Sequence, residues 1–361
     1  MNFSEVTDIT IPEGSVTKIT DSNNRVLWQK GLAIPKAHWE IVELPSEDSN
    51  GNAYNPLLTF VDTGDGIEIF KRTGGQHFKY RADGTAESIY TFQDTPTIKC
   101  ADIDPVSKKW IAFGSDYASN AFSGTKALDG SNKLICCWSP KLECFCAISS
   151  RDAVVVNLNG EIQGTSQEVP FSAISGGRRD ESLIWADSLD KFVIPETTGT
   201  NNYVCFSSDG LNWETKTIIL TGEFPDISAD YTRITMYQIR WMPTMKKFVS
   251  VCRVNASDSY KEYIVKSSDC QRWECVGKYM LVGSAVETTL SYSSDKKVLA
   301  VDNLQTSYVT RDLENWVEVP FIDGMPQGNS ARTMKWSQSL NCFVRFGTES
   351  NPRFYKLVID N

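Results

Sequence analysis

Pairs of bulky apolar residues separated by seven positions recur along most of this 361-residue chain. The stretch "CCWSPKLECFC" places Trp138 and Phe145 on either side of a short polar segment, and "LIWADSLDKF" does the same with Trp185 and Phe192. The other pairs are Ile103 with Trp110, Trp241 with Phe248, Trp336 with Phe343, and the one-residue-shorter Tyr292 with Val298. Two strands joined by a tight polar turn give this pattern, so each pair predicts a β-hairpin.

The spacing of these hairpins predicts the fold. Their first bulky residues lie 35 to 56 positions apart, about 47 on average. A strand-rich repeat of roughly 40–50 residues is typical of β-propeller blades with four strands each. An earlier unit, "LLTFVDTGDGIEIF", lacks the Trp but has the same hairpin pattern, and a second turn follows at Asp83-Gly84. We therefore expect an all-β fold, a β-propeller of seven four-stranded blades, with six blades as the alternative.

The two ends of the repeat region are related in sequence. The last unit begins near Arg332 and reaches the end of the chain without an obvious fourth strand. Near the start, "AHWEIVELP" (Ala37 to Pro45) resembles "LENWVEVP" (Leu313 to Pro320), which is a fourth strand in its own unit. We expect the N-terminal strand to complete the last blade, because closing the ring removes two free sheet edges.

A second motif follows the hairpins in three units, as "SSDGLNW", "SSDCQRW" and "TRDLENW". Asp and Gly favour a tight turn in which the carboxylate accepts local backbone N–H bonds, and the Trp can pack between blades. This reasoning predicts a structural and not a catalytic role for all six motif residues. Weaker copies of the motif occur near Asp83 and Asn159. The motif residues are Asp209 with Trp213, Asp269 with Trp273, and Asp312 with Trp316.

This motif resembles the Asp-box, or bacterial neuraminidase repeat, of sialidase-like β-propellers. The resemblance implies a propeller fold, and in an active sialidase it would imply three clustered arginines, a Tyr–Glu nucleophile pair and an acidic acid/base. No arginine here can be matched to such a cluster from the sequence; the candidates are Arg72, Arg81, Arg151, Arg178, Arg179, Arg233 and Arg240. A sialidase-like glycan-processing enzyme or a glycan-binding lectin therefore stays as the alternative function.

Other chemistry has little support in the sequence. Asp62 to Glu68 and Asp102 to Pro105 contain clustered oxygens that could hold calcium, although hairpin turns use the same residues. His38 and His77 are the only histidines, and the ten cysteines include no CxxC pair, so we expect reduced and mostly buried thiols. No nucleotide-binding or hydrolase motif occurs. We predict no cofactor, no metal site and no catalytic residue.

Charge and hydropathy exclude two classes of partner. The net charge of −9 is unfavourable for binding duplex nucleic acid. No apolar run approaches the length needed to cross a membrane, and "MNFSEVTDITIPEG" has neither the basic nor the apolar region of a secretory signal. We expect neither nucleic-acid binding nor membrane insertion.

Residues 1–30 do not fit the repeat and are predicted to be a separate β segment, with the propeller at 31–361. Short strands would alternate with turns at Pro12-Glu13-Gly14 and Asp21 to Asn24. The phrase "IPEGSVTKITDSNNRVLW" is similar to a segment of bacteriophage tail and virion proteins. That similarity implies an adaptor that docks on other virion or tail proteins. The alternative is an ordinary extension packed on the side of the propeller.

Together these patterns predict a non-enzymatic bacteriophage virion (tail) structural protein, made in the bacterial host cytoplasm. Its propeller would attach to a protein or to a host surface glycan or protein receptor. A bacterial cytoplasmic scaffold is a further alternative. The candidate contact residues are the charged loop Gly176 to Glu181 and the loop aromatics Tyr117, Phe122 and Tyr231.

Overall fold

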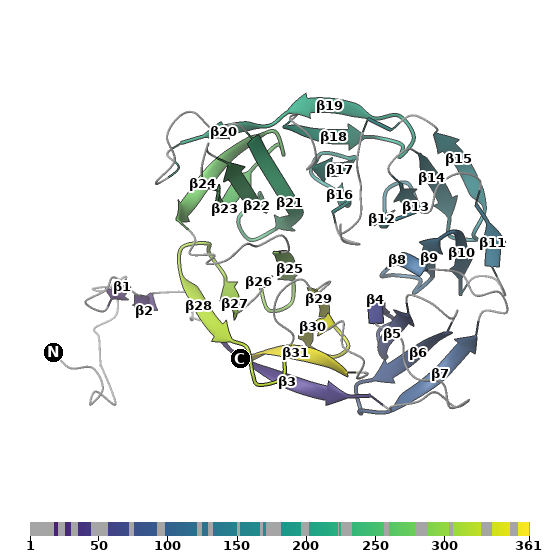
Figure 1. Cartoon of the computed structure of the whole chain (residues 1–361), viewed down its shortest axis with the longest axis horizontal. Coiled ribbons are helices and arrows are strands. Elements are labelled where there is room, and N and C mark those ends of the chain that lie inside the picture. The colour runs from purple at the N-terminus through teal and green to yellow at the C-terminus, as the bar shows by residue number, and fades with distance from the viewer. Residues whose placement is uncertain are drawn as a thin grey trace.

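Seven β-sheets stand in a ring around a central channel, so the chain is a seven-bladed β-propeller as the repeat predicted (Figure 1). No helix occurs among the residues that the computed structural model describes. Those residues are 18–20, 26–29, 35–44, 57–71, 76–91, 98–120, 125–128, 133–149, 152–166, 169–170, 182–195, 202–222, 224, 233–255, 260–278, 288–302, 306–325, 334–346 and 353–360.

The first four blades each contain four antiparallel strands, which follow one another from the channel outward. Blade 1 has β4 (Leu57–Asp62), β5 (Gly66–Lys71), β6 (Gln76–Arg81) and β7 (Ala86–Thr91). Blade 2 has β8 (Ile98–Ile103), β9 (Trp110–Gly114), β10 (Asp116–Ser119) and β11 (Thr125–Ala127). Blade 3 has β12 (Ile135–Ser139), β13 (Cys144–Ile148), β14 (Ala153–Asn157) and β15 (Ile162–Ser166). Blade 4 has β16 (Ile184–Ala186), β17 (Lys191–Pro195), β18 (Tyr203–Ser207) and β19 (Glu214–Thr217).

Blade 5 departs from the four-stranded pattern. It has β21 (Arg233–Met242), β22 (Lys247–Asn255), β23 (Tyr260–Ser267) and β24 (Arg272–Lys278). A fifth strand, β20 (Ile219–Thr221), pairs in parallel with β24 on the outer edge. Because β20 follows β19 after a single residue, the chain passes directly from the rim of blade 4 onto the rim of blade 5. This short strand covers an edge that would otherwise be open.

Blades 6 and 7 complete the ring. Blade 6 has β25 (Thr289–Ser293), β26 (Val298–Asp302), β27 (Thr306–Thr310) and β28 (Trp316–Pro320). Blade 7 has β29 (Met334–Ser337), β30 (Cys342–Phe346), β31 (Arg353–Asp360) and, as its outermost strand, β3 (Lys36–Glu43). The antiparallel register runs from Lys36 opposite Asp360 to Glu43 opposite Arg353. The predicted closure by the N-terminal strand is therefore confirmed.

Each inner hairpin pairs the two bulky residues that the sequence singled out. Trp138 lies opposite Phe145 and Trp336 opposite Phe343, and the same cross-strand pairing occurs in blades 2, 4 and 5. In the four Trp–Phe pairs the ring centroids are 4.6 to 4.9 Å apart. The expected shorter pair in blade 6 is wrong, because Tyr292 lies opposite Leu299 and not Val298. The interval is seven residues there as well.

The turn of each inner hairpin in blades 2 to 7 has one residue in the left-handed region, five positions after the first bulky residue. None of these residues is glycine, although glycine adopts this conformation at least cost. The residues are Lys108, Glu143, Asp190, Lys246, Lys297 and Asn341, with φ between 51° and 59°. The paired strands and their packing therefore impose the turn conformation whatever the side chain.

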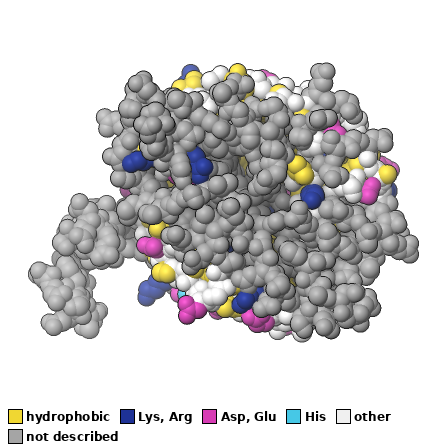
Figure 2. All heavy atoms as spheres, viewed as in Figure 1, with side chains coloured by type: hydrophobic (Ala, Val, Ile, Leu, Met, Phe, Trp, Pro, Cys, Tyr) yellow, Lys and Arg dark blue, Asp and Glu magenta, His cyan; other side chains and the backbone are white. Residues whose placement is uncertain are grey.

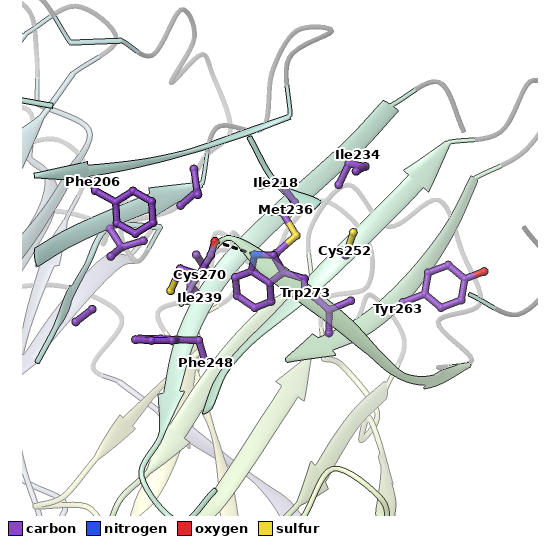
Figure 3. Packing of buried hydrophobic residues seen from close by; sticks show 14 of the residues in the cluster. Phe206, Ile218, Ile234, Met236, Ile239, Phe248, Cys252, Tyr263, Cys270 and Trp273 are labelled. Atoms are coloured by element: carbon purple, nitrogen blue, oxygen red, sulfur yellow. Dashed lines mark hydrogen bonds between the residues drawn. The ribbon is translucent and has the colours of Figure 1, made fainter. Parts of the chain in front are cut away.

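The hydrophobic core is divided among the interfaces between neighbouring blades. Figure 3 shows one such cluster, in which Trp273 of blade 5 lies among Met236 and Ile239 of its own blade, and Phe206 of blade 4 belongs to the same cluster. Similar clusters join blades 3 and 4, and blades 6 and 7. Because both faces of each sheet are covered in this way, a blade depends on its two neighbours for burial.

A buried ion pair joins blades 6 and 7. The side chain of Arg345 on β30 is fully buried, and its Nε lies 2.6 Å from Oδ2 of Asp302 on β26. The other carboxylate oxygen of Asp302 accepts a hydrogen bond from Ser307, and the guanidinium stacks on the ring of Phe321 at 4.6 Å. Because both charges are out of water, each one compensates the cost of burying the other, and removing either would leave an unpaired buried charge.

The two N-terminal strands form a separate element. β1 (Lys18–Thr20) and β2 (Val26–Gln29) pair with each other and with no blade of the described chain. They lie outside the ring in Figure 1. The predicted turns at 12–14 and 21–24 lie outside the described residues. In the described part of the chain no helix is long and apolar enough to span a membrane.

We predict that Arg345→Met lowers the free energy of unfolding by about 3–5 kcal/mol, because it leaves the Asp302 carboxylate buried without its cation. Urea unfolding followed by tryptophan fluorescence measures this. The control is Lys141→Met, which removes an exposed ion pair with Asp190 and should cost at most about 1 kcal/mol. Equal effects of the two substitutions would show that the buried pair does not stabilise the junction.

Candidate functional site

The Asp209 motif forms the turn between β18 and β19. Oδ1 of Asp209 accepts the backbone N–H of Leu211 at 2.8 Å and of Asn212 at 2.7 Å, and Ser207 donates its hydroxyl to the same oxygen at 3.0 Å. Gly210 has φ +78°, and a Cβ at this position would lie 2.8 Å from Val155 of blade 3. The turn is therefore built by the carboxylate and held close against the preceding blade.

The same arrangement repeats in blades 5 and 6. Asp269 accepts the backbone N–H groups two and three residues later at 2.9 and 2.8 Å, and Asp312 does so at 2.9 and 2.8 Å. The residue after each Asp has positive φ, and here it is Cys270 and Leu313 in place of glycine. Both of these side chains are buried, in clusters that include the preceding blade.

The motif tryptophans occupy equivalent positions. The indole N–H of Trp213, Trp273 and Trp316 donates to the carbonyl of the residue after the Asp, at 2.9 to 3.1 Å. Trp273 is fully buried, and the other two pack partly buried at the interface with the preceding blade. The structure thus places the six motif residues in three separate turns and does not bring them together in one site.

A cavity of about 340 Å³ lies in the central channel, and residues of the innermost strands line it. The lining residues are Ala101, Asp102, Cys136, Leu183, Ile184, Arg240, Ser291, Tyr292, Lys335 and Trp336. They come from blades 2 to 7, so the site exists only once the ring has formed. Concave sites with a few convergent polar groups are the usual places for small-molecule binding.

Four polar lining residues share one register position. Asp102, Arg240, Ser291 and Lys335 each immediately precede the first bulky residue of an inner hairpin. Because the innermost strands are equivalent around the ring, this position puts the four side chains at one level of the channel. Arg240, Ser291 and Lys335 come from the consecutive innermost strands β21, β25 and β29, while Asp102 comes from β8 across the channel.

Hydrogen bonds link three of these side chains to neighbouring blades, and the fourth, Arg240, bonds to its own strand. Asp102 accepts the backbone N–H of Trp138 at 2.7 Å, and Ser291 accepts that of Trp336 at 2.9 Å, so each links its blade to the next. The Nζ of Lys335 donates to the hydroxyl of Thr59 at 3.2 Å. The guanidinium of Arg240 donates to the carbonyl of Ile239 at 2.8 Å.

The carboxylates that the sequence analysis considered for calcium are engaged by protein donors. Oδ2 of Asp62 accepts the hydroxyl of Ser337 at 2.6 Å and the backbone N–H of Ser339 at 2.9 Å, which ties blade 1 to blade 7. Asp65 pairs with Lys79 at 2.5 Å, and Asp104 accepts two backbone N–H groups of its own turn. Among the described residues no group of three or more His, Cys, Asp or Glu side chains is placed to hold a metal ion.

Of the candidate arginines, the structure describes the side chains of Arg81 and Arg240, which lie on different blades. Arg81 pairs with Glu87 on the outer strands of blade 1, whereas Arg240 lies on β21, the innermost strand of blade 5. His77 is buried beside Glu68 and stacked on Phe70, whereas His38 is half exposed on β3. The side chains of the other candidate arginines lie outside the described residues. Figure 2 shows described charges of both signs interspersed around the rim.

The loop candidates have mixed outcomes. Tyr117 is buried and donates its hydroxyl to the carbonyl of Gly160 at 3.0 Å, so the expectation that it lies on a contact loop is wrong. Phe122, Tyr231 and the loop Gly176 to Glu181 lie outside the described residues. All ten cysteines are free and eight are buried, as the spacing predicted. Burial raises the pKa of the Cys136 and Cys146 thiols well above the usual value.

The chain is therefore a propeller with a small cavity in its channel, lined by both polar and apolar residues. No protein-family model matches its sequence, and no curated protein matches it. Three solved structures with this fold are virginiamycin B lyase from Staphylococcus aureus (8% identity, 90% of this chain and 100% of that chain, TM-score 0.58), YCF48 bound to D1 peptide (13%, 89% and 96%, 0.58) and the WD40 β-propeller domain of Doa1 (11%, 89% and 97%, 0.54). At such identities the likeness shows the fold alone.

We predict that Asp209→Asn weakens the dependence of stability on pH below about pH 4. Burial raises the pKa of Asp209, but hydrogen bonds from the backbone and side chain of Asn212 outweigh it and hold that pKa below its ordinary value. A lowered pKa stabilises the fold above the unfolded-state value, and this contribution is lost as the pH falls through the folded-state value.

Urea unfolding from pH 6 to pH 2.5 measures the effect, with Asp295→Asn in an exposed turn as the control. The Asp209 variant should be less stable than the wild type at pH 6 and should approach it at low pH. A constant difference across the range would show that the carboxylate charge is not what supports the turn.

Proposed function

We propose that this protein is a non-enzymatic component of a bacteriophage tail, with residues 1–30 as an adaptor and the propeller as an attachment module. The observation that carries the proposal is the separate β1–β2 hairpin, which pairs with none of the described blade strands. A two-stranded hairpin is marginal by itself and gains stability by docking on a larger surface. Neighbouring tail proteins would supply that surface.

The connection between the hairpin and the propeller supports the adaptor role. The hairpin precedes β3 in the chain, and β3 is the outermost strand of the closing blade. Eight residue pairs join β3 to β31, and Lys356 adds an ion pair with Glu40 at 2.6 Å. A force that reaches β3 from the adaptor would therefore be borne by a continuous antiparallel ladder.

Other propellers support a protein-binding use of the fold. The YCF48 structure contains a bound D1 peptide. For this chain, the expected partners are other tail proteins at the adaptor and a host protein or surface glycan at the propeller. The turns and loops around a propeller ring vary without disturbing the blades, which suits them to recognition.

We rank attachment above a sialidase-like or lectin function. The motif carboxylates of Asp209 and Asp269 accept backbone N–H groups in turns, and Arg81 and Arg240 lie apart. The two candidate arginines with described side chains therefore do not belong to one cluster of the kind that glycan processing of this type would require. Release of a fluorophore from a sialoside above the blank would reverse this ranking.

We predict that deleting residues 1–34 leaves a folded propeller that is missing from phage particles. The deletion ends before Lys36, so β3 remains to close the ring. Mass spectrometry of purified particles measures the copy number, and circular dichroism checks the fold of the variant. The wild-type chain should appear at a fixed number of copies per particle.

Two outcomes separate the parts of this proposal. If the wild-type chain is absent from particles, the virion role is wrong. If the truncated chain is incorporated at the wild-type level, the virion role stands but the adaptor role of residues 1–30 is wrong. A second deletion that also removes β3 should unfold, which would confirm that the first deletion was placed correctly.

A further inference from the structure

The walls of the channel cavity differ in chemistry from one side to the other. Blades 5 to 7 contribute Arg240, Ser291 and Lys335, together with the aromatic rings of Tyr292 and Trp336. Blades 3 and 4 contribute an apolar wall of Cys136, Leu183 and Ile184. A ligand that satisfies both walls must have a polar group at one end and an apolar body at the other.

The charge of the lining is opposite to that of the whole protein. Arg240 and Lys335 bring two positive charges and Asp102 one negative charge, so the lining carries a net charge of +1 in a chain of net charge −9. Burial raises the pKa of Tyr292 and of Cys136, which keeps both neutral near pH 7. Asp102 lies across the channel on β8 and already accepts two backbone N–H groups, from Ile103 and Trp138.

We propose that this cavity binds a small organic anion, with its carboxylate or phosphate group held between Arg240 and Lys335 and its apolar body against Leu183 and Ile184. Both cations are half-buried, so solvent weakens their attraction for the anionic group of the ligand less than it would on the surface. A guanidinium presents a planar fork of donors that matches either anionic group.

The size of the cavity limits the ligand. A volume of about 340 Å³ is at the lower end of the range for small-molecule sites, which suits a single substituted ring and excludes a polymer chain within the cavity. Trp336 and Tyr292 can pack on the faces of such a ring. The proposal does not depend on the virion role, because the cavity belongs to the propeller itself.

Isothermal titration calorimetry on the full chain tests the proposal with two matched probes. Benzoate and benzamide have nearly the same shape, but only benzoate carries a charge. Benzoate should bind and benzamide should not. Lys335→Met and Arg240→Gln should each weaken benzoate binding by about tenfold or more, the usual effect of losing a charge-assisted hydrogen bond. Lys247→Met, at the start of β22 and outside the cavity lining, is the charge-matched control and should bind as the wild type does.

Phenyl phosphate and inorganic phosphate complete the test. Phenyl phosphate binding more tightly than benzoate would identify phosphate as the preferred anionic group, and the reverse would identify carboxylate. Inorganic phosphate should bind more weakly than phenyl phosphate, because it cannot use the apolar wall. The proposal is wrong if benzoate and benzamide bind alike, or if neither benzoate nor phenyl phosphate binds at millimolar concentration. It is also wrong if the Lys335 and Arg240 variants bind benzoate as the control does. Thermal unfolding of each variant checks that a loss of binding is not a loss of fold.

Discussion

The pairing of β3 with β31 closes the ring, and the packing of every blade depends on that closure. Each blade buries both faces of its sheet against its neighbours. An open ring would therefore expose the two faces with which blades 1 and 7 pack against each other. The junction beside this closure is also reinforced by polar contacts. Asp62 of blade 1 binds Ser337 and Ser339 of blade 7, more than 270 positions away along the sequence. Hydrogen bonds of this kind fix a position in a way that apolar packing alone does not, because they depend on direction.

Local patterns in the sequence were sufficient to predict the blades. The pairing of Trp138 with Phe145 could be predicted because a tight hairpin brings residues seven apart into opposition. The error at Tyr292 has a simple cause: Val298 and Leu299 are both apolar, so the pattern did not distinguish them, whereas the strand register selects Leu299. β20 could not be predicted, because "ETKTIILT" reads as one strand and only the position of blade 5 divides it.

The channel site could not have been predicted in the same way. Asp102, Arg240 and Lys335 are ordinary strand residues in their own hairpins, and they are more than 90 positions apart in the sequence. They converge only because a ring places equivalent positions of different blades around one axis. The available signal was their common position, one residue before the first bulky residue of each hairpin. Comparing that position across the repeats would have identified three charged residues, each between two apolar residues in the sequence.

Blade 7 connects the two surfaces for which we propose a binding function. Its innermost strand, β29, contributes Lys335 to the channel, and its outermost strand, β3, continues from the N-terminal segment. Three strand spacings separate them, or about 15 Å at the usual distance between paired strands. A partner at the adaptor and a small anion in the channel would therefore occupy opposite edges of one sheet without contact. Since the sheet between them is held by complete ladders and by the buried Arg345, both can be bound at once, and neither needs the other to form.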